Sequence, residues 1–420
     1  MEPKAYVESL ARESRRAAAQ LAAAPGALRD RALRAAAAEL RRAKALLQGA
    51  NAKDLARAKE AGLAAAMIDR LALTDKVVEG MAASLEQIAA QTDPVGQTIC
   101  AYNRPDGLRI EKRRVPIGVI GVIYESRPNV TAEAAGLCLK SANACILRGG
   151  KEALESNRAI AAALRRAIAQ AGLPPAAVAV IESTDHAIVT ALGQAVGLID
   201  LLIPRGGEGL IRAVAESARI PVIKHYTGNC HVYIDERADA KMARAIVLNA
   251  KCQRPGICNA METLLVHSAH LGQGGILPQI VEDLLAAGVE IRGDERVAAL
   301  SPKIKPATED DWYKEYLDLI LAVRVVDSLQ AAIDHINAYG SHHTDAIVTE
   351  CVPSADAFVV QVDSASVMVN ASTRLADGGV YGLGAEVGIS TDKLHARGPM
   401  GAEDLTTYKW IVTGQGHLRE

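Results

Sequence analysis

The sequence is poor in aromatic residues, which make up 3% of its 420 residues and include a single Phe and two Trp. Half of the residues are hydrophobic, so the chain can still form a large core, but its helices must pack through alanine and other small side chains. Runs of about 18 or more apolar residues are absent, and residues 1–16 mix both charge signs without an apolar stretch. The sequence therefore predicts neither a membrane span nor a secretory signal.

The sequence also lacks any extended run of residues with the same charge. The formal net charge is −2 and no basic tract occurs, which argues against nucleic acid or a membrane surface as the main partner. CxxC pairs are absent as well, and the seven cysteines are irregularly spaced. Scattered single cysteines in a chain of this length are typical of a reduced, cytoplasmic protein. They are Cys100, Cys138, Cys145, Cys230, Cys252, Cys258 and Cys351.

The order of predicted elements indicates an α/β fold. Apolar residues at helical spacing predict helices over residues 5–92, interrupted at Pro25-Gly26. Beyond them, short apolar runs alternate with helical segments, a pattern typical of parallel sheets with helices on both faces. A first set of strands is expected at 115–125, 144–150, 177–183, 198–204 and 221–228. A second set is expected at 230–235, 261–267, 289–293, 317–327, 344–350 and 366–372.

Cys258 lies in a Gly- and Pro-containing loop, residues 249–262, with Lys251 and Arg254 upstream. Local positive charge lowers the pKa of a thiol, and the thiolate is the nucleophile, so the loop is suited to a reactive cysteine. A lone cysteine is otherwise most often a small core residue, and Cys252 is a rival in the same loop.

Other motifs are weaker. The GxGxxG fingerprint is absent, but residues 204–210 form a Gly-rich strand-to-helix turn whose Gly206 and Gly207 N–H groups could receive a pyrophosphate. A Gly pair before a helix also serves as a plain tight turn. His342 and His343 are adjacent, so on an extended strand their side chains diverge, and no metal site is predicted. A substrate-loop or hydrogen-bonding role is expected for them instead.

Four segments, residues 116–131, 249–267, 326–347 and 370–401, together resemble the γ-glutamyl phosphate reductase family of the aldehyde dehydrogenase superfamily. The resemblance extends over nearly the whole chain and implies an aldehyde dehydrogenase-like fold with two parallel-sheet α/β domains and a small oligomerisation sheet. The implied domains are an NADP-binding domain (1–102, 117–228 and 371–403), a catalytic domain (229–370) and an oligomerisation element (103–116 and 404–420). That element would join subunits into a homodimer or homotetramer; without the resemblance it reads as a surface hairpin and a frayed tail.

The resemblance also implies roles for individual residues. Cys258 matches the nucleophile, and Asn129 matches the asparagine whose amide helps to form the oxyanion hole. Taken alone, Asn129 would cap a helix starting near Ala132. Glu315 resembles the glutamate that holds the nicotinamide ribose, although an isolated Glu at a helix end is commonly a solvated charge.

At the end of the 144–150 strand, Arg148, Gly149 and Lys151 are expected to contact the cofactor. Many superfamily members carry Lys and Glu at the positions of Arg148 and Lys151. A cation at Lys151 would favour the 2′-phosphate, and therefore NADPH over NADH. Arg127, Arg254 and Arg374 are candidate anion-binding residues for the substrate.

One absence bears on the reaction. Hydrolytic members carry a Glu in a Glu-Leu-Gly-Gly segment as the base for thioester hydrolysis, whereas residues 224–229 here contain no carboxylate. This absence fits phosphorolysis, or its reverse, in place of hydrolysis. The resemblance implies NADPH-dependent reduction of L-glutamyl 5-phosphate, which glutamate 5-kinase would supply, to L-glutamate 5-semialdehyde and phosphate through a cysteine thioester. This is the second step of proline biosynthesis from glutamate. The alternatives are an aldehyde dehydrogenase for another small aldehyde and a catalytically silent scaffold.

Overall fold

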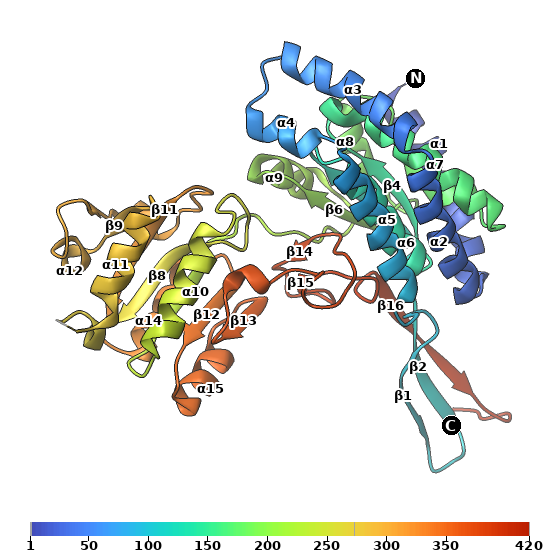
Figure 1. Cartoon of the computed structure of the whole chain (residues 1–420). Coiled ribbons are helices and arrows are strands. Elements are labelled where there is room, and N and C mark those ends of the chain that lie inside the picture. Colours follow the sequence, from blue (N-terminus) through green and yellow to red (C-terminus); the bar gives the residue numbers. More distant parts are fainter. Residues whose placement is uncertain (1, 273, 420) are drawn as a thin grey trace. The chain divides into compact units, whose positions relative to one another are not determined.

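A computed structural model describes residues 2–272 and 274–419 (Figure 1). It divides the chain into two compact units. Unit 1 comprises Met1–Lys224, Gly382–Gly388 and Leu394–Glu420, and unit 2 comprises His225–Tyr381 and Ile389–Lys393. The first boundary thus follows residue 224, where the sequence places it after 228, and residues 371–381 belong to unit 2. The functional roles expected for the domains stay predictions.

The N-terminal helices of unit 1 pack through small side chains, as the composition predicts. They are α1 (Pro3–Ala23), α2 (Gly26–Arg42), α3 (Lys44–Glu60), α4 (Ala65–Leu71) and α5 (Asp75–Ala90). The predicted interruption is confirmed, because Pro25 is the N-cap residue of α2. Ala32, Ala36 and Ala37 of α2 are buried in the same core cluster as Met81 and Leu85 of α5. Short side chains allow the helix backbones to approach closely.

The sheet of unit 1 is parallel, with strand order β5-β4-β3-β6. Its strands are β3 (Val119–Tyr124), β4 (Ala144–Arg148), β5 (Val178–Val180) and β6 (Leu201–Arg205). The helices that follow them are α6 (Asn129–Lys140), η1 (Lys151–Ala153), α7 (Leu154–Gln170), η2 (Pro175–Ala177), α8 (Ala187–Gly193) and α9 (Glu208–Ser217). All residues of β3 and β4 are buried, as expected for strands covered on both faces.

The strand expected at 221–228 is wrong. Only an isolated bridge between Leu202 and Val222 forms there. Its first residue, Pro221, cannot donate to a sheet, and after residue 224 the chain passes into unit 2. The short apolar run at its start does not form a strand, because the chain leaves unit 1 directly after it.

A three-stranded antiparallel sheet of order β1-β2-β16 projects from unit 1 (Figure 1). It consists of β1 (Thr98–Asn103), β2 (Arg109–Pro116) and β16 (Thr406–Thr413). The predicted hairpin and the strand-like tail therefore pair with each other, although the hairpin begins at Thr98, earlier than expected. The strand expected at 115–125 is split, because its first residues end β2 and Gly118, with φ +133°, turns the chain into β3.

Unit 2 contains a parallel seven-stranded sheet of order β10-β9-β11-β8-β7-β12-β13. Its strands are β7 (Cys230–Ile234), β8 (Met261–His267), β9 (Glu290–Gly293), β10 (Lys305–Pro306), β11 (Ile320–Val326), β12 (Thr344–Val348) and β13 (Ser366–Val369). Its helices are α10 (Ala240–Cys252), η3 (Ser268–His270), α11 (Ile276–Ala286), α12 (Glu295–Ala298), α13 (Glu309–Trp312), α14 (Leu329–Tyr339), α15 (Val352–Gln361) and η4 (Thr373–Leu375). Two short strands, β14 (Ile389–Ser390) and β15 (Gly398–Pro399), lie in the C-terminal part of the chain.

Helix α15 is absent from the sequence-based expectation. Its β-branched residues and its short apolar face give no clear helical pattern in the sequence. The structure nevertheless places β12 and β13 next to each other as parallel strands. Parallel neighbours need a crossover connection, which α15 provides.

None of the described helices combines the length and hydropathy that crossing a bilayer requires.

Candidate functional site

Cys258 lies between the end of α10 and the start of β8, at the amino-terminal edge of the unit 2 sheet. Gly228 precedes β7, Glu315 precedes β11 and His343 directly precedes β12. Strands β11, β8, β7 and β12 are consecutive neighbours and parallel, so their amino ends share one edge. The sheet therefore brings together side chains that are far apart in the sequence.

Two contacts to the Cys258 backbone, one from a side chain and one from a glycine, fix its loop against β7 and the residues before it. The thiol of Cys230 donates to the Cys258 carbonyl oxygen at 3.2 Å. A Cβ added at Gly228 would overlap that same oxygen and the Cys258 Cα, so the two backbones touch. Only glycine fits at position 228.

A buried ion pair closes the base of the same loop. Lys251 Nζ lies 2.6 Å from Glu262 Oε2, and both side chains are fully buried. Burial raises the pKa of Glu262 to about 7 and lowers the pKa of Lys251, while the pairing opposes both shifts. Glu262 Oε1 also accepts the Leu317 N–H at 3.1 Å. Lys251 is therefore paired with Glu262, which offsets the positive charge that the sequence analysis places near Cys258.

Glu315 has a defined structural partner. Its Oε1 accepts the Gly228 N–H at 2.8 Å, and the side chain is half-buried. It is thus not a freely solvated charge at a helix end. Because Gly228 touches Cys258, Glu315 helps to hold the backbone on which the thiol depends.

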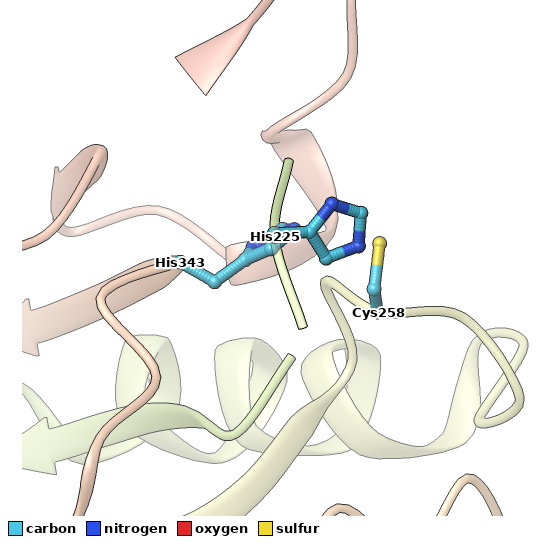
Figure 2. A group of neighbouring side chains, drawn as sticks. All are labelled: His225, Cys258 and His343. Atoms are coloured by element: carbon cyan, nitrogen blue, oxygen red, sulfur yellow. The ribbon is translucent and has the colours of Figure 1, made fainter. Parts of the chain in front are cut away.

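Two histidines lie beside Cys258 (Figure 2). The ligand atoms of His225, Cys258 and His343 all lie within 4.8 Å of one another. His225 Nδ1 is 2.8 Å from the Ile389 carbonyl oxygen, which can only accept, so this nitrogen carries the proton and Nε2 is basic. Burial lowers the pKa of His343 to about 3.

The extended conformation expected for the paired histidines is wrong. His342 has φ +60° and is not extended, and β12 begins only at Thr344. His343 lies close to His225 and Cys258, which are also of metal-ligand type. Spacing along the sequence did not reveal this, because His225 precedes β7 whereas His343 precedes β12. His225 itself was not identified as a site residue from the sequence. The available signal was its position within residues 224–229, the segment noted for its missing carboxylate.

Arg374 interacts electrostatically with Cys258. Burial lowers the pKa of Arg374, and Coulombic attraction to Cys258 opposes that shift. Its Nε donates to the Gln253 carbonyl at 2.8 Å, and its buried Nη1 has no hydrogen-bond partner among the described residues. Arg254 also interacts with Arg374, is exposed, and has φ +64°. Unit 2 therefore carries Cys258, Glu315, Arg254 and Arg374.

The remaining predicted site residues belong to unit 1. Arg148 ends β4, and burial lowers its pKa while Glu152 opposes the shift. The buried Nε of Arg148 has no hydrogen-bond partner in the described part of the chain. Gly149 follows directly, and the Lys151 side chain is exposed. These residues lie at the carboxyl ends of parallel strands, where open α/β sheets bind ligands.

The Gly206-Gly207 turn is already occupied by protein. The Gly207 N–H donates to Glu125 Oε1 at 3.0 Å, and a Cβ added at Gly206 would lie 2.7 Å from Glu125 Cδ. A pyrophosphate could use this N–H only after the Glu125 carboxylate moved away. Gly206 and Gly207 therefore fit the expected role poorly in this conformation.

Asn129 and Arg127 lie after β3. Asn129 is the first residue of α6 and Pro128 is its N-cap, so the capping interpretation of Asn129 is wrong. The Asn129 amide instead donates to Glu133 Oε1 at 3.0 Å. Arg127 is exposed.

Comparison with known proteins gives matches over nearly the whole chain. The model of the aldehyde dehydrogenase family matches residues 2–307. The crystal structure of a γ-glutamyl phosphate reductase from Thermotoga maritima is 46% identical, covers 98% of this chain and 99% of that chain, and has a TM-score of 0.95. A γ-glutamyl phosphate reductase from Saccharomyces cerevisiae is 33% identical over 98% of each chain, with a TM-score of 0.54. An acetylating aldehyde dehydrogenase from Geobacillus thermoglucosidasius, at 17% identity, 100% and 98% coverage and a TM-score of 0.70, shows the shared fold alone. The predicted fold is confirmed.

The contact between Gly228 and Cys258 makes a first prediction. Gly228→Ala should lower stability by about 1–3 kcal/mol, because the new methyl group must push the Cys258 backbone aside. The rate at which iodoacetamide alkylates Cys258 should change with it. Thermal unfolding and alkylation followed by mass spectrometry measure the two effects. Gly209→Ala is the control, since nothing lies within 4 Å of its added Cβ; equal behaviour of the two variants would contradict the close approach.

The buried ion pair makes a second prediction. Lys251→Met should destabilise the protein by about 3–5 kcal/mol above the Glu262 pKa, because an unpaired carboxylate remains buried. A carboxyl group whose folded pKa exceeds its unfolded value favours folding when protonated, so the loss should grow as pH rises through about 7. Urea unfolding of both proteins at several pH values measures this. Adding Glu262→Gln should remove the pH dependence, and a loss that stays constant with pH would contradict the assignment.

Proposed function

Because the chain belongs to the aldehyde dehydrogenase family and, within it, to the γ-glutamyl phosphate reductases, we propose that it reduces L-glutamyl 5-phosphate with NADPH to L-glutamate 5-semialdehyde and phosphate. This is the second step of proline biosynthesis. The observation that carries the proposal is the Cys258 thiol, held on a rigid edge of the sheet beside an imidazole and a guanidinium.

Acylation would begin with the thiolate of Cys258. His225 Nε2 accepts the thiol proton, and the thiolate then attacks the acyl phosphate carbon. The C–O bond to phosphate breaks, and a thioester on Cys258 and free phosphate result. The guanidinium of Arg374, with Nη1 unpartnered among the described residues, suits the phosphate or the developing oxyanion.

The cofactor contacts in unit 1 support NADPH in part. The buried Arg148 Nε needs an acceptor, and the exposed Lys151 ammonium suits a 2′-phosphate. Glu125 on the Gly207 N–H does not suit a pyrophosphate without rearrangement. NADPH, when bound, supplies the hydride that reduces the thioester carbon.

The last step releases the aldehyde from Cys258. The C–S bond of the thiohemiacetal breaks, the sulfur leaves as a thiolate, and the hydroxyl proton passes to a base. His225 is suited to this proton transfer because its Nε2 is turned toward the sulfur (Figure 2). Asn129 is proposed as an oxyanion-hole donor and Glu315 as a ribose contact, each in addition to its observed hydrogen bond.

His225 changes the argument about hydrolysis. Residues 224–229 lack a carboxylate, as the sequence analysis notes, but they do not lack a titratable base. Hydrolysis would require this base to activate water, whereas its basic nitrogen faces the sulfur itself. We therefore retain phosphate, and not water, as the partner of the thioester in the reverse direction.

Assembly and location are part of the same proposal. We propose that the sheet β1-β2-β16 joins subunits into a homodimer or homotetramer, because its exposed side chains include Tyr102, Tyr408, Trp410 and Val412. We also propose a cytoplasmic location, a reducing compartment that suits seven free cysteines, and glutamate 5-kinase as the source of the acyl phosphate.

The nucleophile provides a third prediction. Cys258→Ala should lower kcat by on the order of 10⁴–10⁶-fold, because no covalent intermediate can form. NADPH binding, followed by fluorescence, should remain. Cys252→Ala should keep activity within about twofold of the wild type, since burial raises the pKa of this thiol and keeps it protonated. An inactive Cys252 variant beside an active Cys258 variant would reverse the assignment.

Coenzyme choice provides a fourth prediction. Lys151→Glu should erode the preference for NADPH over NADH, since a carboxylate repels the 2′-phosphate and accepts hydrogen bonds from ribose hydroxyls. The ratio of kcat/KM for the two coenzymes is the measurement, and Lys151→Gln separates loss of attraction from added repulsion. A ratio unchanged in both variants removes Lys151 from the coenzyme site.

The fate of the thioester provides a fifth prediction. In the oxidative direction, glutamate semialdehyde and NADP should give a burst of one NADPH per active site that stalls without phosphate and continues with phosphate or arsenate. Stopped-flow absorbance measures the burst, and other small aldehydes run beside it test substrate choice. Steady NADPH formation without either anion would mean that water attacks the thioester and would assign the protein to the hydrolytic enzymes.

A further inference from the structure

The side chains of His225, Cys258 and His343 form a cluster with two nitrogen donors and one sulfur donor (Figure 2). The three ligand atoms lie within 4.8 Å of one another, and all three residues belong to unit 2. Each side chain comes from a different strand connection, at the shared edge of β7, β8 and β12. A rigid sheet edge thus holds the cluster together.

The outward nitrogen of each histidine is already oriented. His225 Nδ1 donates to the Ile389 carbonyl at 2.8 Å, and His343 Nδ1 lies 2.9 Å from Thr344 Oγ1. Histidines that bind metals typically donate their second ring N–H to such a partner, which fixes the ring and leaves the other nitrogen for the metal. The His343 side chain is fully buried, and its Nε2 has no hydrogen-bond partner among the described residues. This buried acceptor is an independent sign of a ligand.

The donor set selects the class of ligand. One thiolate and two imidazoles suit Zn²⁺ or Cd²⁺, whereas Mg²⁺ and Ca²⁺ prefer oxygen ligands. Metal–sulfur and metal–nitrogen bonds of about 2.3 and 2.0 Å need the donor atoms roughly 3–4 Å apart, so small side-chain movements would complete the site. A fourth position would remain open for water or an anion.

We propose that His225, Cys258 and His343 form a binding site for Zn²⁺ or Cd²⁺ whose occupation reversibly blocks the thiol. Binding replaces the proton of the Cys258 thiol with the metal ion and releases that proton to solvent. Coordination withdraws electron density from the sulfur, and the metal ion occupies the space beside it, so attack on a substrate carbonyl is blocked. The blocking effect depends on the proposed function, because it requires Cys258 to be the nucleophile, but metal binding does not.

The binding test uses the full-length protein in thiol-free buffer. Zn²⁺ is titrated in competition with a chromophoric chelator, and Co²⁺ is used as a spectroscopic probe for thiolate coordination. The wild type should bind one equivalent and show a cobalt–thiolate charge-transfer band. Cys258→Ser should lose the band, and His343→Gln should weaken binding by at least about tenfold, the least that loss of even an outer-shell partner usually costs.

Matched variants separate this site from adventitious binding. Cys252→Ser and His342→Gln change the neighbouring thiol and the neighbouring imidazole, and both should bind Zn²⁺ as the wild type does. If His343→Gln fails to fold, as circular dichroism would reveal, His225→Gln replaces it. Failure of the wild type to compete with the chelator, or equal binding by Cys258→Ser and the wild type, would overturn the site.

Activity is a separate readout. Zn²⁺ should inhibit reduction by the wild type and by Cys252→Ser, with recovery after addition of a chelator. Stoichiometric binding without inhibition would overturn the blocking role alone. An inactive wild type that still binds one Zn²⁺ through Cys258 would refute the proposed function and leave the metal site standing.

Discussion

The Cys258 loop depends on the buried ion pair between Lys251 and Glu262, which joins the end of α10 to the start of β8. The two ends of the loop are therefore joined by their side chains, with Lys251 Nζ 2.6 Å from Glu262 Oε2. Glu262 also binds the backbone before β11, where Glu315 reaches back to Gly228, and Gly228 touches Cys258. Together these contacts form a closed network, or circuit, of linked residues around the Cys258 loop. A nucleophile must be held within a fraction of an ångström, and this circuit restrains both ends of its loop.

The two units use opposite edges of their parallel sheets. In unit 1 the predicted cofactor residues follow β4 and β6, at carboxyl ends, where helix N-termini can meet anions. In unit 2 the proposed reactive groups precede β7, β8, β11 and β12, at the amino ends of these strands. The carboxyl-edge rule consequently locates Arg148 and Lys151 but cannot locate Cys258. Its position follows from the ion pair and from glycine at position 228, both of which are tertiary features.

Periodicity in the sequence predicted most strands and the helices of unit 1, because buried parallel strands and alanine-rich helices leave strong local patterns. Periodicity failed for residues 221–228 and for α15. There the structure is decided by how the chain connects neighbouring elements, and not by the local preference of the residues. The Cys258 loop was recognised from its motif, whereas the burial of Lys251 and its pairing with Glu262 were not predicted, because the sequence alone does not show which charged side chains become buried together. The meeting of His225 and His343 beside Cys258 was missed for a related reason, since these histidines are 118 positions apart in the sequence and only the strand order brings them together.

A thiol that must react at neutral pH needs a base nearby, and an imidazole is the common choice. His225 meets that need, with its tautomer fixed by the Ile389 carbonyl. His343 is different, because burial holds its pKa at about 3 and it therefore stays neutral during turnover. A permanently neutral imidazole cannot transfer the thiol proton at neutral pH, yet it retains a lone pair beside the sulfur. In the proposed mechanism, the arrangement that would activate Cys258 would therefore also make it a ligand for soft cations. The donor atoms do not exclude such metals, so their exclusion would have to come from the cell or from bound substrate.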